Sequence, residues 1–262
     1  MSNNSNRYEL MMDAFAEVTS ELDTSHHTKP IPAQPPLEQV LADFGPMPDE
    51  ALFLGVASDE LPVLLNLHDS VPGPLLVVGD SGSGKTAFLQ MIAGAVESMH
   101  QPEKVQFGTV TNHPDEWSGF ASVQNNVGIF PIHHRSAEDF ILSLASWAHG
   151  NKSSRQSVLL LLDDLEAVTS MEMDAIQNLR WLLLRGPSRR VWPIITLNSN
   201  RIDKMEPWLE AFRTRIFGNM RNPNHIRELN AENARLESLA SGSEFTMSEG
   251  DHWLRFSIPT LD

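Results

Sequence analysis

The chain has 262 residues, a length that suits one α/β domain with extensions and a full hydrophobic core. Its formal net charge of −15 argues against a constitutive nucleic-acid coat, and the absence of cysteine excludes disulfides and thiolate metal sites. No apolar run approaches the roughly 18 residues of a membrane span, and the first residues lack the apolar core of a signal peptide. We therefore expect a cytoplasmic protein with no membrane segment of its own.

Residues 1–50 are acidic and contain several prolines, which predicts a partly disordered N-terminal arm. Apolar spacing over 8–22 favours a short amphipathic helix, 28–36 is proline-rich and extended, and 37–44 favours another helical turn or two. A disordered leader and a docking arm for a neighbouring subunit or partner both fit this pattern. We expect the folded domain to cover residues 51–262.

In the first part of that domain, the sequence pattern predicts strands around one helix. A turn at 58–60 separates two apolar stretches, prolines break the chain before a third, and a helical apolar stripe then ends before Pro102. The expected strands are 52–56, 61–67, 75–78 and 105–110, and the expected helix is 86–99.

The second part of the domain continues the alternation of strands and helices. A helix is predicted to begin at the pair Ser136 and Asp139, which have capping-box spacing, and to end at Gly150. The continuous apolar run 158–162 is typical of a central parallel strand that is covered on both faces. The other expected elements are a short helix and loop in 112–126, helices at 171–184, 204–212 and 223–240, and strands at 128–132, 193–197, 215–217, 245–247 and 253–258.

This order predicts an α/β fold with three layers, in which helices cover both faces of a mainly parallel sheet with right-handed crossovers. The stretch 52–67 would add an N-terminal hairpin. The stretch 245–258, with a turn around residue 250, would add a C-terminal β-hairpin.

The sequence LLVVGDSGSGKT is the most specific motif in the chain. It satisfies G-x-x-x-x-G-K-[ST], the phosphate-binding loop of nucleoside triphosphatases, between an apolar strand and an amphipathic helix. Its glycines let successive N–H groups surround an anion, Lys85 supplies charge for the β- and γ-phosphates, and the Thr86 hydroxyl is a magnesium ligand. We expect ATP and Mg²⁺ as cofactors. The expected nucleotide-binding residues are Gly79, Asp80, Ser81, Gly82, Ser83, Gly84, Lys85 and Thr86.

A pair of aspartates ends the apolar run at 158–162. Asp163 has the position of a carboxylate that holds magnesium, together with Thr86. Asp164 has the position of the carboxylate that polarises the attacking water, although one aspartate of the pair could instead cap the next helix. Because aspartate has a shorter reach than glutamate, turnover could be slow or need stimulation by a partner.

Asn198 follows the next strand, where an amide can sense the γ-phosphate or orient water, or simply cap a loop. The stretch 177–227 carries ten basic and three acidic side chains, a local excess in an acidic protein. We expect this basic block to supply phosphate contacts on one face. Its candidates for an arginine that reaches a neighbour's γ-phosphate are Arg185, Arg189, Arg190 and Arg215.

Residues 52–258 resemble the FtsK/HerA group of P-loop ATPases and, within it, the FtsK/SpoIIIE-type domains of EccC-like type VII secretion proteins. Five segments carry the resemblance: the hairpin that leads into GDSGSGKT, the ending LLLLDDLEAV, the strand WPIITLNSNR, the TRI of FRTRIFGNM and the closing SGSEFTMSEGDHWLRFSIP. This chain departs from the family pattern at Asp164, where FtsK has glutamate, and at Asn198, where glutamine is usual.

The resemblance implies a motor-type ATPase that acts as a hexameric ring, with ATP between subunits, to translocate DNA or protein. It implies catalytic roles for Lys85, Asp164, Asn198 and Arg215, the last matching the arginine of the family's TRI. Two other functions stay open: a nucleotide-gated assembly or regulatory protein with weak or no hydrolysis, and a generic AAA+ ATPase. The hairpin before the loop and the lack of a helical lid argue against the AAA+ alternative.

Overall fold

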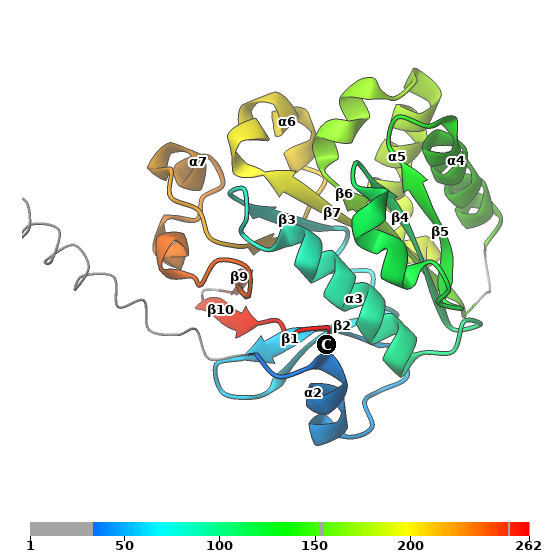
Figure 1. The fold of residues 1–262 in the computed structure, drawn as a ribbon. Helices are drawn as coiled ribbons and strands as arrows, with labels where there is room; N and C mark the ends of the chain where they lie inside the picture. The colour runs from blue at the N-terminus through cyan, green and yellow to red at the C-terminus, as the bar shows by residue number, and fades with distance from the viewer. Residues whose placement is uncertain (1–33, 152–154, 251, 262) are drawn as a thin grey trace, which may run out of the picture. The chain divides into compact units, whose positions relative to one another are not determined.

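The computed structural model describes residues 34–151, 155–250 and 252–261. A single sheet of ten strands runs through them in the order β2-β1-β10-β9-β8-β3-β7-β6-β4-β5 (Figure 1). The strands are β1 Ala51–Ala57, β2 Pro62–Asn66, β3 Leu75–Gly79, β4 Val105–Thr111, β5 Asn126–Pro131, β6 Ser157–Asp163, β7 Val191–Asn198, β8 Thr214–Phe217, β9 Glu244–Glu249 and β10 His252–Ser257. The α-helices are α2 Leu37–Phe44, α3 Lys85–Met99, α4 Arg135–Gly150, α5 Met173–Arg185, α6 Ile202–Leu209 and α7 Pro223–Glu228.

The half of the sheet from β8 to β5 is parallel throughout. Every residue of β3 and of β6 is buried, as expected for strands that helices cover on both faces. The carboxyl ends of β3, β6 and β7 therefore meet at one edge of the sheet, which is where ligands bind in open α/β folds. The prediction of a mainly parallel sheet is confirmed in this half.

The other half is antiparallel and consists of the two predicted hairpins. β1 pairs with β2 and β9 pairs with β10, while β1 also pairs with β10 and β9 with β8. The hairpins from the two ends of the domain are therefore neighbours in the same sheet. The sequence predicted each hairpin but not this pairing, because no local pattern links strands so far apart in the chain.

Helices cover both faces of the sheet, which confirms the three layers. Leu75 and Val77 of β3 face α3 and pack in one core with Phe88 and Ile92. The alternate residues of β3 belong to a second core, which includes the apolar residues of α4, α5 and α6. This arrangement follows from the alternation of side chains along a strand.

Residues Gln34–Asp262 form one compact unit, which begins earlier than residue 51. Leu37 and Val40 of α2 are buried, and the Leu37 backbone N–H donates to the Thr260 carbonyl at 2.7 Å. The chain near α2 thus belongs to the folded domain because it pairs with the C-terminal segment. The helix expected at 8–22 and most of the proline-rich stretch lie outside the described residues.

Two helix predictions need correction. The helix expected at 223–240 ends at Glu228, and 3-10 turns follow at Glu232–Ala234 and Leu236–Ser238. Asn230 and Arg235 adopt positive φ angles of 55° and 52°, which a continuous α-helix does not allow.

The second correction concerns the start of α4. The N-cap is His134, whose ring nitrogen Nδ1 accepts from the Ser136 backbone N–H at 3.2 Å. Ser136 is therefore inside the helix, and Asp139 forms an ion pair with Arg135 at 3.9 Å instead of completing a capping box.

Candidate functional site

The loop between β3 and α3 depends on its glycines. Gly82 and Gly84 adopt φ angles of 76° and 93°, a region that side chains disfavour. A Cβ at Gly84 would also lie 2.5 Å from the Gly242 carbonyl oxygen, and one at Gly79 would collide with the Ser83 side chain. The loop conformation therefore requires glycine at all three positions.

Lys85 begins α3 and folds back over the loop. Its Nζ donates to the carbonyl oxygens of Gly79 at 3.1 Å and Asp80 at 2.8 Å. Burial lowers the pKa of the Lys85 ammonium, and the nearby carboxylates of Asp163, Asp164 and Asp80 oppose that shift. The cation is thus held at the mouth of a loop whose N–H groups suit an anion.

Thr86 and Asp163 join the loop to the end of β6. The Thr86 hydroxyl lies 3.0 Å and 3.2 Å from the two carboxylate oxygens of Asp163. Thr196 of β7 donates to the same carboxylate at 3.0 Å. Burial raises the pKa of Asp163, whereas the hydrogen bonds from Thr86 and Thr196 act in the opposite direction.

This hydroxyl and carboxylate are the residues that would hold a magnesium ion. Both are hard oxygen donors, and Mg²⁺ in phosphate sites takes few protein ligands because it keeps water and substrate phosphate oxygens. Among the described residues, no group of three or more His, Cys, Asp or Glu side chains could hold a metal ion alone. The donor chemistry therefore fits Mg²⁺ bound together with a nucleotide.

Asp164 lies next to Asp163 in an unusual backbone conformation, with φ 89° and ψ 109°. Its N–H donates to the Thr196 hydroxyl at 2.7 Å, and its carboxylate accepts from the Glu166 N–H at 3.0 Å. Asp164 thus caps the 3-10 helix Leu165–Ser170 while it lies at the edge of the site. Burial raises the pKa of its carboxyl group.

Asp80 connects the loop to two other segments. Its carboxylate accepts hydrogen bonds from the Ser199 hydroxyl and, at 3.0 Å, from the Arg221 N–H. Its own N–H donates to the Asn219 carbonyl at 2.9 Å. This side chain, which the sequence assigned only to the phosphate loop, fixes the loop against the ends of β7 and β8.

Asn198 is the last residue of β7 and pairs in register with Gly79. It therefore lies beside the first residue of the loop. Its side-chain oxygen accepts from the Asn200 N–H at 3.4 Å, so Asn198 also caps the turn that follows.

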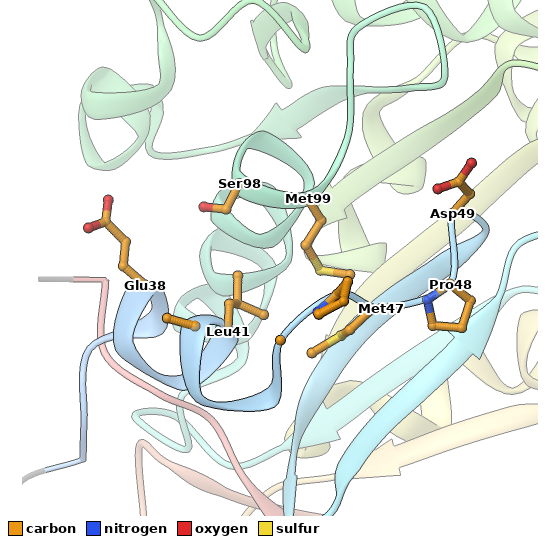
Figure 2. A pocket seen from close by; sticks show the side chains of 10 residues that line it. Glu38, Leu41, Met47, Pro48, Asp49, Ser98 and Met99 are labelled. Carbon is orange, nitrogen blue, oxygen red and sulfur yellow. The ribbon is translucent and has the colours of Figure 1, made fainter.

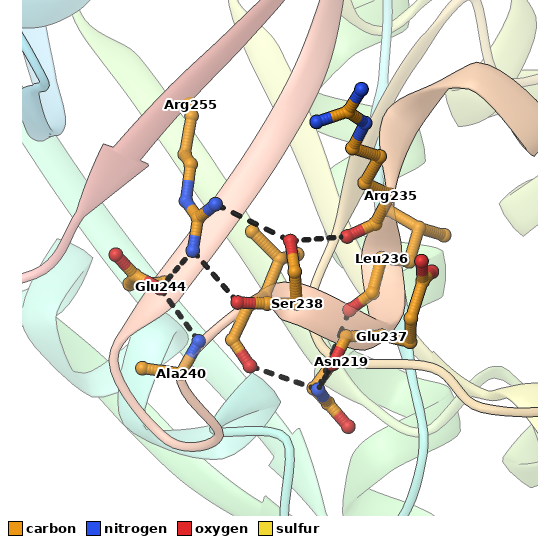
Figure 3. A network of polar contacts seen from close by, with 9 residues as sticks. Asn219, Arg235, Leu236, Glu237, Ser238, Ala240, Glu244 and Arg255 are labelled. Atoms are coloured by element: carbon orange, nitrogen blue, oxygen red, sulfur yellow. Dashed lines mark hydrogen bonds and ion pairs between the residues drawn. The ribbon is translucent and has the colours of Figure 1, made fainter. Parts of the chain in front are cut away.

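The segment 236–243 packs against the same loop. The Asn219 amide donates to the carbonyl oxygens of Leu236, Glu237 and Leu239 at 3.4, 3.3 and 2.8 Å (Figure 3). Ser241 donates to the Gly82 carbonyl at 2.9 Å.

The start of β9 holds the end of this segment. The Glu244 carboxylate accepts from the Ala240 N–H at 2.6 Å and pairs with Arg255 at 2.5 Å (Figure 3). The closing hairpin is thereby tied to the phosphate loop.

The arginine candidates lie away from the loop of their own chain. The Arg215 guanidinium, on β8 beside Leu76, donates to the Leu209 carbonyl at 2.9 Å. Arg189 and Arg190 precede β7, at the opposite end of the strand from Asn198, and Arg185 ends α5. Within the described part of the chain, none of the four forms a hydrogen bond or an ion pair with the phosphate loop.

A cavity of about 630 Å³ opens between α2 and the last turn of α3 (Figure 2). Leu41, Met47 and Met99 line it, with Glu38 and Asp49 at its margins. Because Met99 ends the helix that Lys85 begins, the cavity lies at the far end of α3 from the phosphate loop. We therefore assign no part of the nucleotide site to it.

Three residues of the site were not identified from the sequence. Thr196 could have been noticed in the sequence, because it is a polar residue inside the apolar run at 194–197. Ser199 and Asn219 could not have been, because their partners lie more than a dozen residues away in the chain and only the fold brings them together.

Solved structures with the same fold include ATPases. The cytoplasmic domain of the type VII secretion ATPase EccC from Thermomonospora curvata aligns with a TM-score of 0.64 at 13% identity, over 87% of this chain and 28% of that one. EssC (ATPases 2 and 3) from Geobacillus thermodenitrificans aligns at 0.61 and 12%, over 83% and 48%. The pCW3 conjugation coupling protein TcpA, solved with ATPγS, aligns at 0.66 and 12%, over 88% and 70%.

No protein-family model matches the chain, and no curated protein matches it significantly. The chain spans less than half the length of the EccC and EssC structures. The fold is that of the P-loop ATPases. More particularly, it is FtsK-like, which supports the resemblance to EccC-like domains at the level of the fold.

Proposed function

We propose that this chain binds and hydrolyses ATP with Mg²⁺ and uses the cycle to move a polymer. The observation that carries the proposal is the contact between Thr86 and Asp163, at 3.0 Å, beside Lys85. It supports the proposal because it places two oxygen donors of the kind that Mg²⁺ prefers near a lysine ammonium at one edge of the sheet.

Each residue has a role that follows from its position. The loop N–H groups and the Lys85 ammonium bind the phosphates, while Thr86 and Asp163 hold the metal. When bound, magnesium neutralises charge that develops on the phosphate oxygens. Asp164 and Asn198, at the ends of β6 and β7, orient the attacking water.

A ring would complete the site. Because the four arginine candidates lie away from their own phosphate loop, any of them that contacts a γ-phosphate would belong to a neighbouring subunit, as in a hexamer. Arg185, Arg189, Arg190 and Arg215 are the candidates. DNA and protein are both possible cargoes; a related EccC structure contains a signal-sequence peptide, and TcpA is a conjugation coupling protein.

A second function has one observation in its favour. The Asp164 carboxylate already accepts a backbone hydrogen bond from Glu166 at 3.0 Å, which weakens it as a catalytic base. ATP binding would then set the oligomeric state, and hydrolysis would be slight or absent.

ATPase assays with and without DNA, alongside mass measurement with ATP, separate these functions. The motor predicts turnover and a ring-sized mass with ATP. A monomer without turnover in every condition contradicts it. If DNA is the cargo, its binding should weaken steeply with salt because phosphate contacts release counterions.

A further inference from the structure

A groove runs along α3 where α2 packs beside it. Its wider part is the cavity of about 630 Å³ at the last turn of α3 (Figure 2). A hollow of about 350 Å³ adjoins that cavity, because Glu38 and Ser98 line both. We call the two together the α3 groove. Its larger apolar side chains include Leu41, Met47, Met99, Phe120 and Leu261.

The rim of the α3 groove is acidic. Of the described residues that line it, Glu38, Asp49, Glu97 and Glu116 are acidic, and none is lysine, arginine or histidine. Lys104 pairs with Asp49 at 3.3 Å, but within the described ranges Glu38 and Glu97 are exposed and form no ion pair. The groove therefore suits an apolar segment that carries positive charge.

The exposed side of α5 has that character. Met173, Gln177, Arg180 and Leu184 are three or four residues apart and so lie in line on one face of this helix, which we call the α5 stripe. Met173 and Leu184 are 65% and 71% exposed. Arg180 is exposed as well, with its guanidinium 4.8 Å from the centre of the Trp208 ring. The α5 stripe thus presents two large apolar side chains with a cation between them.

The α3 groove and the α5 stripe lie on opposite faces of the sheet. α2 and α3 pack in the core that contains Leu75 and Val77, whereas Leu179 and Leu182 of α5 pack in the other core. One chain therefore cannot bring its own α5 stripe into its own α3 groove. A contact between the two surfaces joins two copies head to tail, and such contacts repeat to give rings or filaments.

Charge favours this occupant over the segment 1–33, which precedes α2 in the chain. That segment carries more acidic than basic side chains, so the acidic rim repels it. The net charge of −15 also makes copies of the chain repel one another wherever opposite charges do not meet. The α5 stripe matches the groove in both charge and apolar character.

We propose that the α5 stripe of one copy binds in the α3 groove of the next, an inference that rests on the proposed ring. Met173 and Leu184 supply the apolar contacts, and Arg180 pairs with the free carboxylates of Glu38 and Glu97. This assignment gives the ring a specific surface between subunits.

The position of the groove agrees with a site between subunits. Gln90 and Glu97 line the groove and follow Thr86 by about one and three helical turns, so all three lie on the same face of α3. The groove therefore begins one turn from this proposed magnesium ligand. A copy bound there lies next to the nucleotide site without replacing any of its residues.

The test measures the mass of the full chain by mass photometry and sedimentation, with Mg²⁺ and ATPγS. A groove variant, Glu38→Lys with Glu97→Lys, keeps the α5 stripe, and a stripe variant, Met173→Ser with Leu184→Ser, keeps the groove. We expect each variant alone to associate about tenfold or more weakly than wild type. Mixed in equal amounts, the two should form a dimer and nothing larger, because one intact groove then meets one intact stripe.

The double variant Val71→Ser with Glu103→Lys is the matched control. It makes the same kinds of substitution at exposed positions outside both surfaces, and it should assemble like wild type. Because every substituted side chain is exposed, all variants should melt near the wild-type temperature. High salt should weaken wild-type assembly, since it screens the charges that meet in the groove.

The outcomes separate this interface from the ring on which it rests. Wild-type protein that stays monomeric in every condition overturns both. Assembly of both variants at the wild-type level overturns the interface alone, and a mixture that stays monomeric overturns the head-to-tail contact. Chemical labelling of the Glu38 and Glu97 carboxylates should be full in dilute monomer and reduced in the oligomer. Reduced labelling in the monomer would assign the groove to a segment of the same chain and overturn the inference.

Discussion

Asp163 receives hydrogen bonds from Thr86 on α3 and Thr196 on β7, so one carboxylate joins three segments of the chain. Thr196 also accepts the N–H of Asp164, which fixes the backbone at the point of its positive φ. The sequence predicted Asp163 and Thr86 because their motifs are local. It marked Thr196 only as a polar residue within an apolar run, because the hydrogen bonds of Thr196 depend on strand register.

The affinity for the magnesium nucleotide should depend on pH through Asp163. Burial raises the pKa of this carboxyl group, so protonation begins at a higher pH than for an exposed aspartate, and a protonated carboxyl binds Mg²⁺ poorly. Affinity should therefore fall as pH falls through this raised pKa. Titrations of a fluorescent ATP analogue across pH, with wild type and Asp163→Asn, measure it.

The variant should bind weakly and lose this pH dependence. The stability of the nucleotide-free protein should change with pH in the opposite direction to the affinity. A folded-state pKa above the unfolded value contributes stability that is present at low pH and is lost as pH rises through the folded pKa. Affinity that is flat with pH in the wild type would contradict this account.

Asp80 should stabilise the fold as well as the loop. Asp80→Ala leaves the Ser199 hydroxyl and the Arg221 N–H without their acceptor, so we expect a loss of about 1–3 kcal/mol in the free energy of unfolding. Urea denaturation measures it. The control Glu103→Ala removes an exposed carboxylate and should change the stability little. Equal stability of the two variants would show that the hydrogen bonds of Asp80 do not stabilise the fold.

Among the elements, the parallel strands were the easiest to predict. The runs at 75–78 and 158–162 are continuously apolar and end in glycine or aspartate, so both their burial and their ends are visible locally. The stretch 223–240 was predicted wrongly as one helix. Its polar residues Asn230 and Arg235 take left-handed conformations, and the Asn219 side-chain amide, from another part of the chain, binds the carbonyl groups of Leu236 and Leu239.

Asn219→Ala should loosen the segment 236–243. The three carbonyl oxygens that share its amide would lose their donor, so we expect about 1–3 kcal/mol less stability and faster amide hydrogen exchange in that segment. Hydrogen-exchange mass spectrometry measures it, with Asn224→Ala on exposed α7 as the control. Unchanged exchange in Asn219→Ala would show that the amide does not hold the segment.

Gly84→Ala should disturb the junction of β3 with α3. The new Cβ would lie 2.5 Å from the Gly242 carbonyl at a φ of 93°, so either the loop or the segment 236–243 must move. We expect a lower melting temperature and nucleotide affinity reduced by about tenfold or more. Gly150→Ala is the control, because nothing lies within 4 Å of its Cβ position.

At the scale of the whole molecule, the two hairpins make the sheet asymmetric. β10 and β9 connect β1 to β8, and the segment before β9 contacts the phosphate loop through Ser241. The segment before β9 therefore connects the phosphate loop to the antiparallel half of the sheet. No helix of the described residues is long and apolar enough to cross a membrane.

The most direct test of the account is nucleotide binding by Lys85→Ala. Equilibrium titration with a fluorescent ATP analogue should give saturable, Mg²⁺-dependent binding for wild type and for the control Lys104→Ala, a surface lysine paired with Asp49. Lys85→Ala should bind about 100-fold more weakly and show no turnover, because the loop loses its charge for the phosphates. Binding and hydrolysis by Lys85→Ala at the wild-type level would contradict the central claim.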